Sequence, residues 1–195
     1  MSSFSDYQEL NVLDLGCGVG RNSIFVAKSF QGEKCQIDCV DILPVAIELL
    51  EKNASEHGVQ DRIKGTVAPI EDYQIAKDNY DLIMAISALE HIDSEEHFFE
   101  KLLEIKNGIR DDGIVCLVIN SDVTEIDSAT NEELMPNFEV NLQTDVILDF
   151  LDEEFLEWEV IKRSVSVQEY DIPRDGITSR LSTKVITFVA RKIAL

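Results

Sequence analysis

The sequence predicts an α/β fold with a mostly parallel sheet that carries helices on both faces. Apolar runs of strand length alternate with amphipathic segments along most of the chain, an order that is typical of parallel sheets. The run 80–86 is almost entirely apolar after Asp81, as expected for a strand covered on both sides. Two long strand-like runs near the C-terminus share one turn, which predicts a terminal antiparallel hairpin.

Several of the predicted elements carry a local signal at their ends. Pro44 suits the first turn of a helix, and Ser94, followed by acidic residues, is a suitable helix cap. A turn is expected at 173–176, where Pro, Arg, Asp and Gly follow one another, whereas 121–143 look irregular. The expected strands are about 11–15, 35–41, 62–68, 80–86, 113–120, 156–169 and 179–192. The expected helices are about 20–30, 44–57, 94–108 and 144–152.

Length and composition indicate one globular domain, 1–195. The chain has 195 residues, of which 45% are apolar, enough for a sizeable core. No apolar run reaches the roughly 18 residues of a membrane helix, and the start of the chain lacks the pattern of a secretory signal. Cys17, Cys35, Cys39 and Cys116 form no C-x-x-C pair, so we expect reduced thiols, no metal site and a cytoplasmic protein.

The charge of the chain is strongly negative and unevenly distributed. A net charge of −21 argues against nucleic acid as a partner, because phosphate binding needs clustered Lys and Arg. Residues Asp111 to Glu159 include fifteen Asp and Glu and no Lys, Arg or His. This segment is either a solvated acidic surface or a region that attracts a cationic substrate or a basic partner.

Residues 11–22 form the most informative segment. An apolar run stops at Gly16, glycine recurs at Gly18 and Gly20, and an amphipathic run begins at once. Glycine suits such a turn because it tolerates positive φ and lets a ligand approach the backbone, and the following helix offers free N–H groups to an anionic ligand group. The spacing is D-x-G-x-G-x-G from Asp14, whereas dinucleotide folds use G-x-G-x-x-G, so a nicotinamide oxidoreductase is the weaker alternative.

This string resembles motif I of the class I S-adenosylmethionine (SAM)-dependent methyltransferases. The resemblance extends over almost the whole chain and implies a Rossmann-like, seven-stranded sheet with a C-terminal antiparallel hairpin. It implies SAM as the cofactor. It places the methionine end of SAM at Asp14, Gly16, Gly18 and Gly20, and it adds Cys17 and Asn22 as cofactor-binding residues of the same turn.

Asp41 ends the second expected strand, about 20 residues beyond the glycines. An acid at this distance commonly accepts the hydroxyls of a bound ribose, and Asp41 resembles the motif II acid of the family. Ile42 would then lie against the adenine ring. The alternative is that Asp41 caps the helix that begins at Pro44.

The region after the third strand departs from the family pattern. Pro69 stands where the family often has an Asp that accepts from the adenine amino group. We therefore expect this contact from Glu71 or Asp72, together with the Ile70 backbone. The alternative is that both acids are solvated loop residues.

Residues 87–92 resemble the motif IV region of small-molecule methyltransferases, in which Leu-Glu-His is frequent. The resemblance implies that Ser87, Ala88, Leu89 and His91 line the space between methyl donor and acceptor. Histidine titrates near neutral pH and suits a general base, so His91 is the candidate catalytic residue. The alternative is that His91 only orders its loop through hydrogen bonds.

The start of the first helix and the C-terminal hairpin look like those of the tellurite-resistance methyltransferase group. Only ten residues precede the first expected strand, fewer than in the usual N-terminal arm of the family. We expect 121–143 to form a substrate-side insertion that covers the site, and the alternatives are a cover from a partner chain and no cover in this version of the chain. The predicted function is methyl transfer from SAM to a small molecule, with no nucleic-acid or membrane partner. The alternatives are a SAM-binding regulatory partner without turnover and methylation of a basic protein.

Overall fold

The computed structural model describes residues 2–174 and 176–194, so Asp175 of the predicted turn lies outside the described residues. The strands are β1 (Glu9–Leu15), β2 (Lys34–Asp41), β3 (Ile63–Val67), β4 (Tyr80–Ile86), β5 (Ile109–Asp127), β6 (Glu133–Leu134), β7 (Glu159–Arg174) and β8 (Ile177–Arg191). The helices are α1 (Arg21–Ser29), α2 (Pro44–Glu56), α3 (Glu95–Gly108) and α4 (Thr144–Glu154), with short 3₁₀ turns η1 (Ser2–Phe4), η2 (Gln60–Arg62) and η3 (Leu89–His91).

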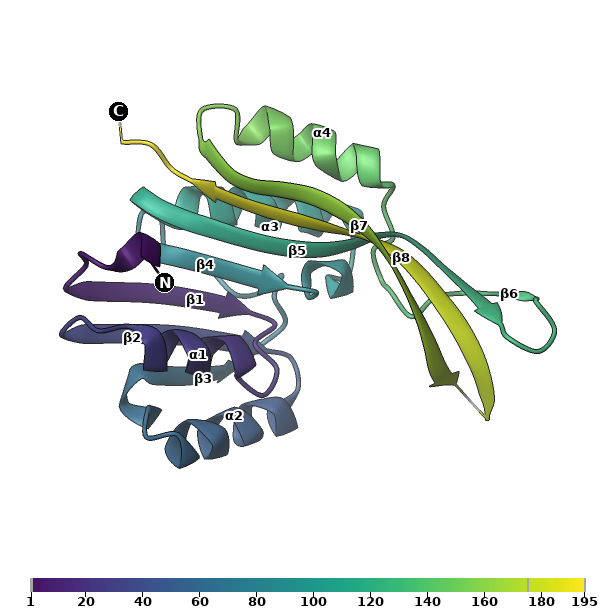
Figure 1. Cartoon of the computed structure of the whole chain (residues 1–195), viewed down its shortest axis with the longest axis horizontal. Helices are drawn as coiled ribbons and strands as arrows, with labels where there is room; N and C mark the ends of the chain where they lie inside the picture. Colours follow the sequence, from purple (N-terminus) through teal and green to yellow (C-terminus); the bar gives the residue numbers. More distant parts are fainter. Residues whose placement is uncertain (1, 175, 195) are drawn as a thin grey trace.

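One twisted sheet organises the chain (Figure 1). Its strand order is β3-β2-β1-β4-β5-β8-β7, and the two-residue β6 pairs with β5 off this path. The first five strands of this order, β3, β2, β1, β4 and β5, are parallel to one another. Strand β8 is antiparallel to β5, and β8 and β7 form the antiparallel hairpin. The order reverses between β1 and β4, which is the point where open α/β sheets bind ligands at the carboxyl ends of their strands.

The helices cover both faces of the sheet, as predicted. One core cluster joins the sheet to α3 and α4 through residues such as Phe98, Leu102 and Leu151. A second cluster joins the other face to α1 and α2. The predicted cap is present, because the Ser94 hydroxyl accepts a hydrogen bond from the His97 backbone N–H at 3.3 Å.

Strand β5 corrects the prediction most clearly. We expected it to end near residue 120 and the chain to become irregular, but β5 continues to Asp127 and pairs with β8 over this length. Its continuation buries the polar residues Ser121 and Glu125. Ser179 donates to the Glu125 carboxylate, and Arg174 of the hairpin forms an ion pair with it. These partners come from distant parts of the chain, so a local apolar pattern could not reveal the strand.

The four cysteines are free thiols, and three of them are buried. No helix within 2–174 and 176–194 is long and apolar enough to cross a membrane. No group of His, Cys, Asp and Glu among the described residues is arranged to hold a metal ion.

Candidate functional site

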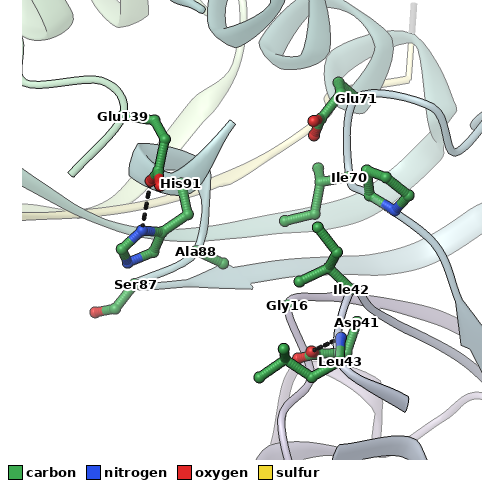
Figure 2. Close-up of a pocket in the computed structure, with 11 residues that line it drawn as sticks. Gly16, Asp41, Ile42, Leu43, Ile70, Glu71, Ser87, Ala88, His91 and Glu139 are labelled. Atoms are coloured by element: carbon green, nitrogen blue, oxygen red, sulfur yellow. Dashed lines mark hydrogen bonds and ion pairs between the residues drawn. The ribbon is translucent and has the colours of Figure 1, made fainter. Parts of the chain in front are cut away.

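A cavity of about 350 Å³ opens at the carboxyl ends of β1, β2 and β4 (Figure 2). This volume lies within the range of small-molecule sites, which is about 300–1,000 Å³. Backbone and side chains of five separate segments meet around it. The lining residues are Gly16, Asp41, Ile42, Leu43, Pro69, Ile70, Glu71, Ser87, Ala88, His91 and Glu139.

Gly16, the first residue of the glycine turn, lines the cavity. The backbone N–H groups of Gly16 and Cys17 both donate to the Val40 carbonyl, at 2.8 and 3.0 Å, and so hold the turn against β2. Gly16 has a φ of +68°, and a Cβ atom there would lie 2.3 Å from the Ala88 Cβ. Because both the backbone conformation and the close approach require glycine, this position brings β1 into direct contact with the loop after β4.

Asp41 holds a carboxylate at the edge of the cavity. One of its oxygens accepts from the Gly18 backbone N–H at 2.8 Å, and the other accepts from the Leu43 N–H at 2.9 Å. The second bond is a local contact just before α2, whose N-cap residue is Leu43 and has no side-chain cap hydrogen bond. The same carboxylate also lines the cavity, where it can accept hydrogen bonds from a ligand.

Aliphatic side chains form an apolar slot beside Asp41. Ile42 and Leu43 are 60% and 56% exposed although they are large and apolar. Figure 2 shows both side chains on the cavity side, across from Ile70. Exposed apolar groups that converge in this way suit a flat, apolar part of a ligand.

The opposite wall is formed by His91 and a segment that enters from beyond β6. The His91 Nδ1 atom lies 2.9 Å from a carboxylate oxygen of Glu139. The ring of Phe138 stacks on the imidazole, with ring centroids 5.1 Å apart. The Val140 backbone N–H donates to the Glu90 carbonyl at 3.0 Å, so the crossing segment is anchored to η3 on both sides of Glu139.

Asp14 lies behind the glycine turn and does not line the cavity. It is 1% exposed, and its carboxylate accepts a hydrogen bond from the Ser23 hydroxyl at 2.5 Å. Burial raises the pKa of Asp14 from 3.8 to about 6, against the opposing effect of the bond from Ser23. Its direct role is to join β1 to α1, because Ser23 lies in the first turn of that helix.

Comparison with known proteins shows the family of this chain. A family model described as a methyltransferase domain matches residues 12–113, more than half of the chain. The chain belongs to this methyltransferase family. Solved structures of the same fold are described as SAM-dependent methyltransferases, and SAM is the cofactor that the family and the fold indicate.

The individual relatives differ in what they methylate. Ajmaline N-methyltransferase from Rauvolfia serpentina is 25% identical over 95 residues, which cover 49% of this chain and 32% of that enzyme. A tRNA1(Val) (adenine(37)-N6)-methyltransferase from Haemophilus influenzae is 33% identical over 76 residues, 38% of this chain and 32% of its own length. The structure of TehB from Haemophilus influenzae has a TM-score of 0.72 at 19% identity and covers 98% of this chain and 60% of that one. The matches to these curated relatives thus span about a third of their length.

The methyltransferase fold brings most of the predicted site residues together. Those that line the cavity are Gly16, Asp41, Ile42, Ile70, Glu71, Ser87, Ala88 and His91. Those that do not line it are Asp14, Cys17, Gly18, Gly20, Asn22, Asp72 and the fully buried Leu89. Asn22 instead lines a separate groove on the α1 face of the sheet. Sequence reasoning missed Leu43 and Glu139, although Glu139 lies in the expected insertion 121–143.

The residues around the cavity fit SAM. A nucleoside needs a hydrogen-bond acceptor for its ribose hydroxyls and an apolar slot for its base. The Asp41 carboxylate lies next to the slot that Ile42 and Ile70 border. Gly18 has open space where a Cβ atom would stand, so the backbone there is accessible to a ligand.

Proposed function

We propose that this chain transfers a methyl group from SAM to a small-molecule acceptor by in-line displacement. When bound, SAM supplies a methyl group that its sulfonium already activates. The protein then needs mainly to hold the acceptor in line with that methyl group, and orientation alone supplies roughly 7–11 kcal/mol in favourable cases. The observation that carries the proposal is one cavity bordered by a nucleoside-compatible wall and, opposite it, by a histidine–carboxylate pair.

On the donor side, we assign Asp41 to the ribose hydroxyls and the slot at Ile42 and Ile70 to the adenine ring. Glu71 lines the cavity whereas Asp72 does not, which favours Glu71 for the adenine amino group. The glycine turn faces the methionine end. Asp14 supports this turn from behind through Ser23.

On the acceptor side, we assign His91 as the general base. Glu139 holds its Nδ1 atom at 2.9 Å and so favours the tautomer in which Nδ1 carries the proton and Nε2 is free to accept one. Glu139 is a positioning residue, because it acts through the imidazole. Phe138 restricts the tilt of the ring by stacking on it.

The charge of the site disfavours a nucleic-acid acceptor and so supports a small one. The cavity wall carries the acids Asp41, Glu71 and Glu139 and no Lys or Arg. The chain has a net charge of −21, which disfavours phosphate-rich acceptors. An acidic wall favours an acceptor that carries an amine over an acceptor with acidic groups. The free thiols support the proposal that the chain acts in the cytoplasm.

The proposal is tested with labelled SAM and a panel of amines, thiols, phenols and tellurite, alongside a basic peptide and tRNA. We expect turnover of at least one small molecule. His91→Gln should lower kcat for an amine or hydroxyl acceptor by about a hundredfold, the lower end of the usual contribution of a general base. His97→Gln is the matched control, because His97 pairs with Asp93 at 2.6 Å on the surface of α3, away from the cavity.

Glu139→Gln separates a positioning role from a structural one. We expect kcat to fall by about tenfold with little change in KM for the acceptor, together with a change in the pH–rate profile. Glu139→Asp should recover part of the rate. Turnover of tRNA or the peptide alone would refute the small-molecule acceptor, and SAM binding without any turnover would support a regulatory role instead.

A further inference from the structure

Strand β7 leaves a long edge of the sheet open. It stands at the end of the strand order and pairs with β8, and no other strand within the described residues pairs with it. Nearly all of its side chains are exposed, and it lies at the outer side of the hairpin in Figure 1. An edge of this kind offers unpaired N–H and C=O groups to another strand, and proteins usually protect it with Pro, bulges or charges.

Two of these protections, a pairing irregularity and a proline, stand near the ends of β7. The pairing with β8 is irregular between Val160 and Lys162, and Pro173 lies near the other end. Between them the strand runs regularly and contains neither proline nor a bulge. The middle of β7 is therefore the part that can accept a further strand.

The outward side chains of this middle part follow an ordered pattern. Arg163, Val165, Val167 and Glu169 point to one face, because successive side chains of a strand alternate. Val165 and Val167 are 43% and 67% exposed. Along this face the strand thus reads cation, apolar, apolar, anion. The Arg163 guanidinium also pairs with Asp152 of α4 at 2.7 Å, so the second copy would have to share this cation.

We propose that β7 pairs antiparallel with β7 of a second copy of this chain, about a two-fold axis through Ser166. In such a pairing, each residue before Ser166 faces the residue equally far beyond Ser166 in the other copy. Val165 then faces Val167, and Arg163 faces Glu169. The symmetry repeats both contacts, so four valines form an apolar strip with an ion pair at each end.

The neighbouring registers do not match in this way. An axis at Val165 would place Arg163 opposite Val167. An axis at Val167 would place Val165 opposite Glu169. Cross-strand pairs of opposite charge and of β-branched residues stabilise a sheet, so the axis at Ser166 is favoured over both neighbours.

The local charge also suits contact between two copies. The chain as a whole is strongly acidic, but residues 160–192 contain seven Lys and Arg against three Asp and Glu. Contact through the hairpin therefore brings together the least acidic part of each copy. The repulsion between the acidic bodies acts over a longer distance and is screened by salt.

Charge exchange tests the pairing. We expect the purified chain to be a dimer in analytical ultracentrifugation at moderate salt, and we expect Glu169→Arg to weaken dimerisation by at least tenfold. Arg163→Glu should weaken it as well, but this change also removes the ion pair with Asp152 of α4, so Glu169→Arg is the sharper single test. The double variant Arg163→Glu/Glu169→Arg restores both ion pairs across the axis and should restore the dimer. Lys52→Glu on α2 is the control, because Lys52 pairs with Glu56 on its own helix, on a different element from β7. Circular dichroism confirms that each variant is folded.

Cross-linking tests the register. Ser166→Cys places one thiol of each copy at the axis, where Cα atoms of paired residues are about 4.5–5.5 Å apart, a separation that suits a disulfide. Ser164→Cys is the matched control, because Ser164 would face Gln168 of the second copy. Rapid disulfide formation by Ser166→Cys alone supports the proposal. A monomeric chain, a dimer that the charge reversals leave unchanged, or equal cross-linking of both variants would overturn it.

Discussion

Burial of Asp14 makes the free energy of unfolding depend on pH, and the variant Asp14→Asn tests this dependence. In the folded chain the pKa of Asp14 is about 6, whereas the pKa of an ordinary Asp carboxyl is 3.8. Between these values the native state binds more protons than the unfolded state, so this group's contribution to stability falls as the pH rises. The contribution is fully present below pH 3.8 and is lost as the pH passes 6.

The size of the effect follows from the two pKa values. Moving a carboxyl pKa from 3.8 to about 6 corresponds to about 3 kcal/mol between its two protonation states. Asn has no charge to lose and can still accept the bond from the Ser23 hydroxyl. We therefore expect the free energy of unfolding of Asp14→Asn, relative to the unchanged chain, to rise by about 2 kcal/mol from pH 4 to pH 7, because part of the change already takes place below pH 4.

Urea unfolding at a series of pH values measures this difference. The contributions of all other carboxyls are common to both proteins and cancel. Asp149→Asn, which removes an exposed carboxyl on α4, is the control and should show little dependence on pH. A difference between Asp14→Asn and the unchanged chain that stays constant from pH 4 to pH 7 would refute the burial argument.

Three further perturbations follow from individual contacts. Gly16→Ala should abolish SAM binding in calorimetry and destabilise the fold by about 2 kcal/mol, because its Cβ would meet Ala88 at 2.3 Å; normal binding would contradict this. Arg174→Met should lower the free energy of unfolding by about 3 kcal/mol by leaving the buried Glu125 carboxylate without its cation, and the double variant Arg174→Met/Glu125→Met should recover part of the loss. Ser94→Ala should cost about 1 kcal/mol in urea unfolding because the α3 cap is lost.

Local patterns in the sequence were sufficient to predict those helices and strands whose ends carry a signal of their own. The apolar run of β4 matches the predicted strand at both ends, and Pro44 begins α2 as expected. The glycine string and Asp41 lie at the carboxyl ends of adjacent strands, so their meeting follows from the parallel sheet.

The contacts that sequence reasoning missed join distant residues. Glu139 contacts His91 because the segment around Glu139 is anchored to η3 through Val140. No repeat or residue spacing in the sequence predicts this contact. Asp14 is an expected site residue that does not line the cavity. Its position beside the glycines suggested contact with the methionine end of SAM, but the turn geometry directs its carboxylate to Ser23 inside the protein.

Titration with SAM and with S-adenosylhomocysteine tests the central claim most directly. We expect saturable binding to the unchanged chain and a loss of at least tenfold in affinity in Asp41→Asn, which keeps the size of the side chain but removes its charge. Asp72→Asn, in a neighbouring exposed acid that does not line the cavity, should bind like the unchanged chain. Equal binding by Asp41→Asn, or no binding by the unchanged chain, would contradict the assignment of this cavity as the SAM site.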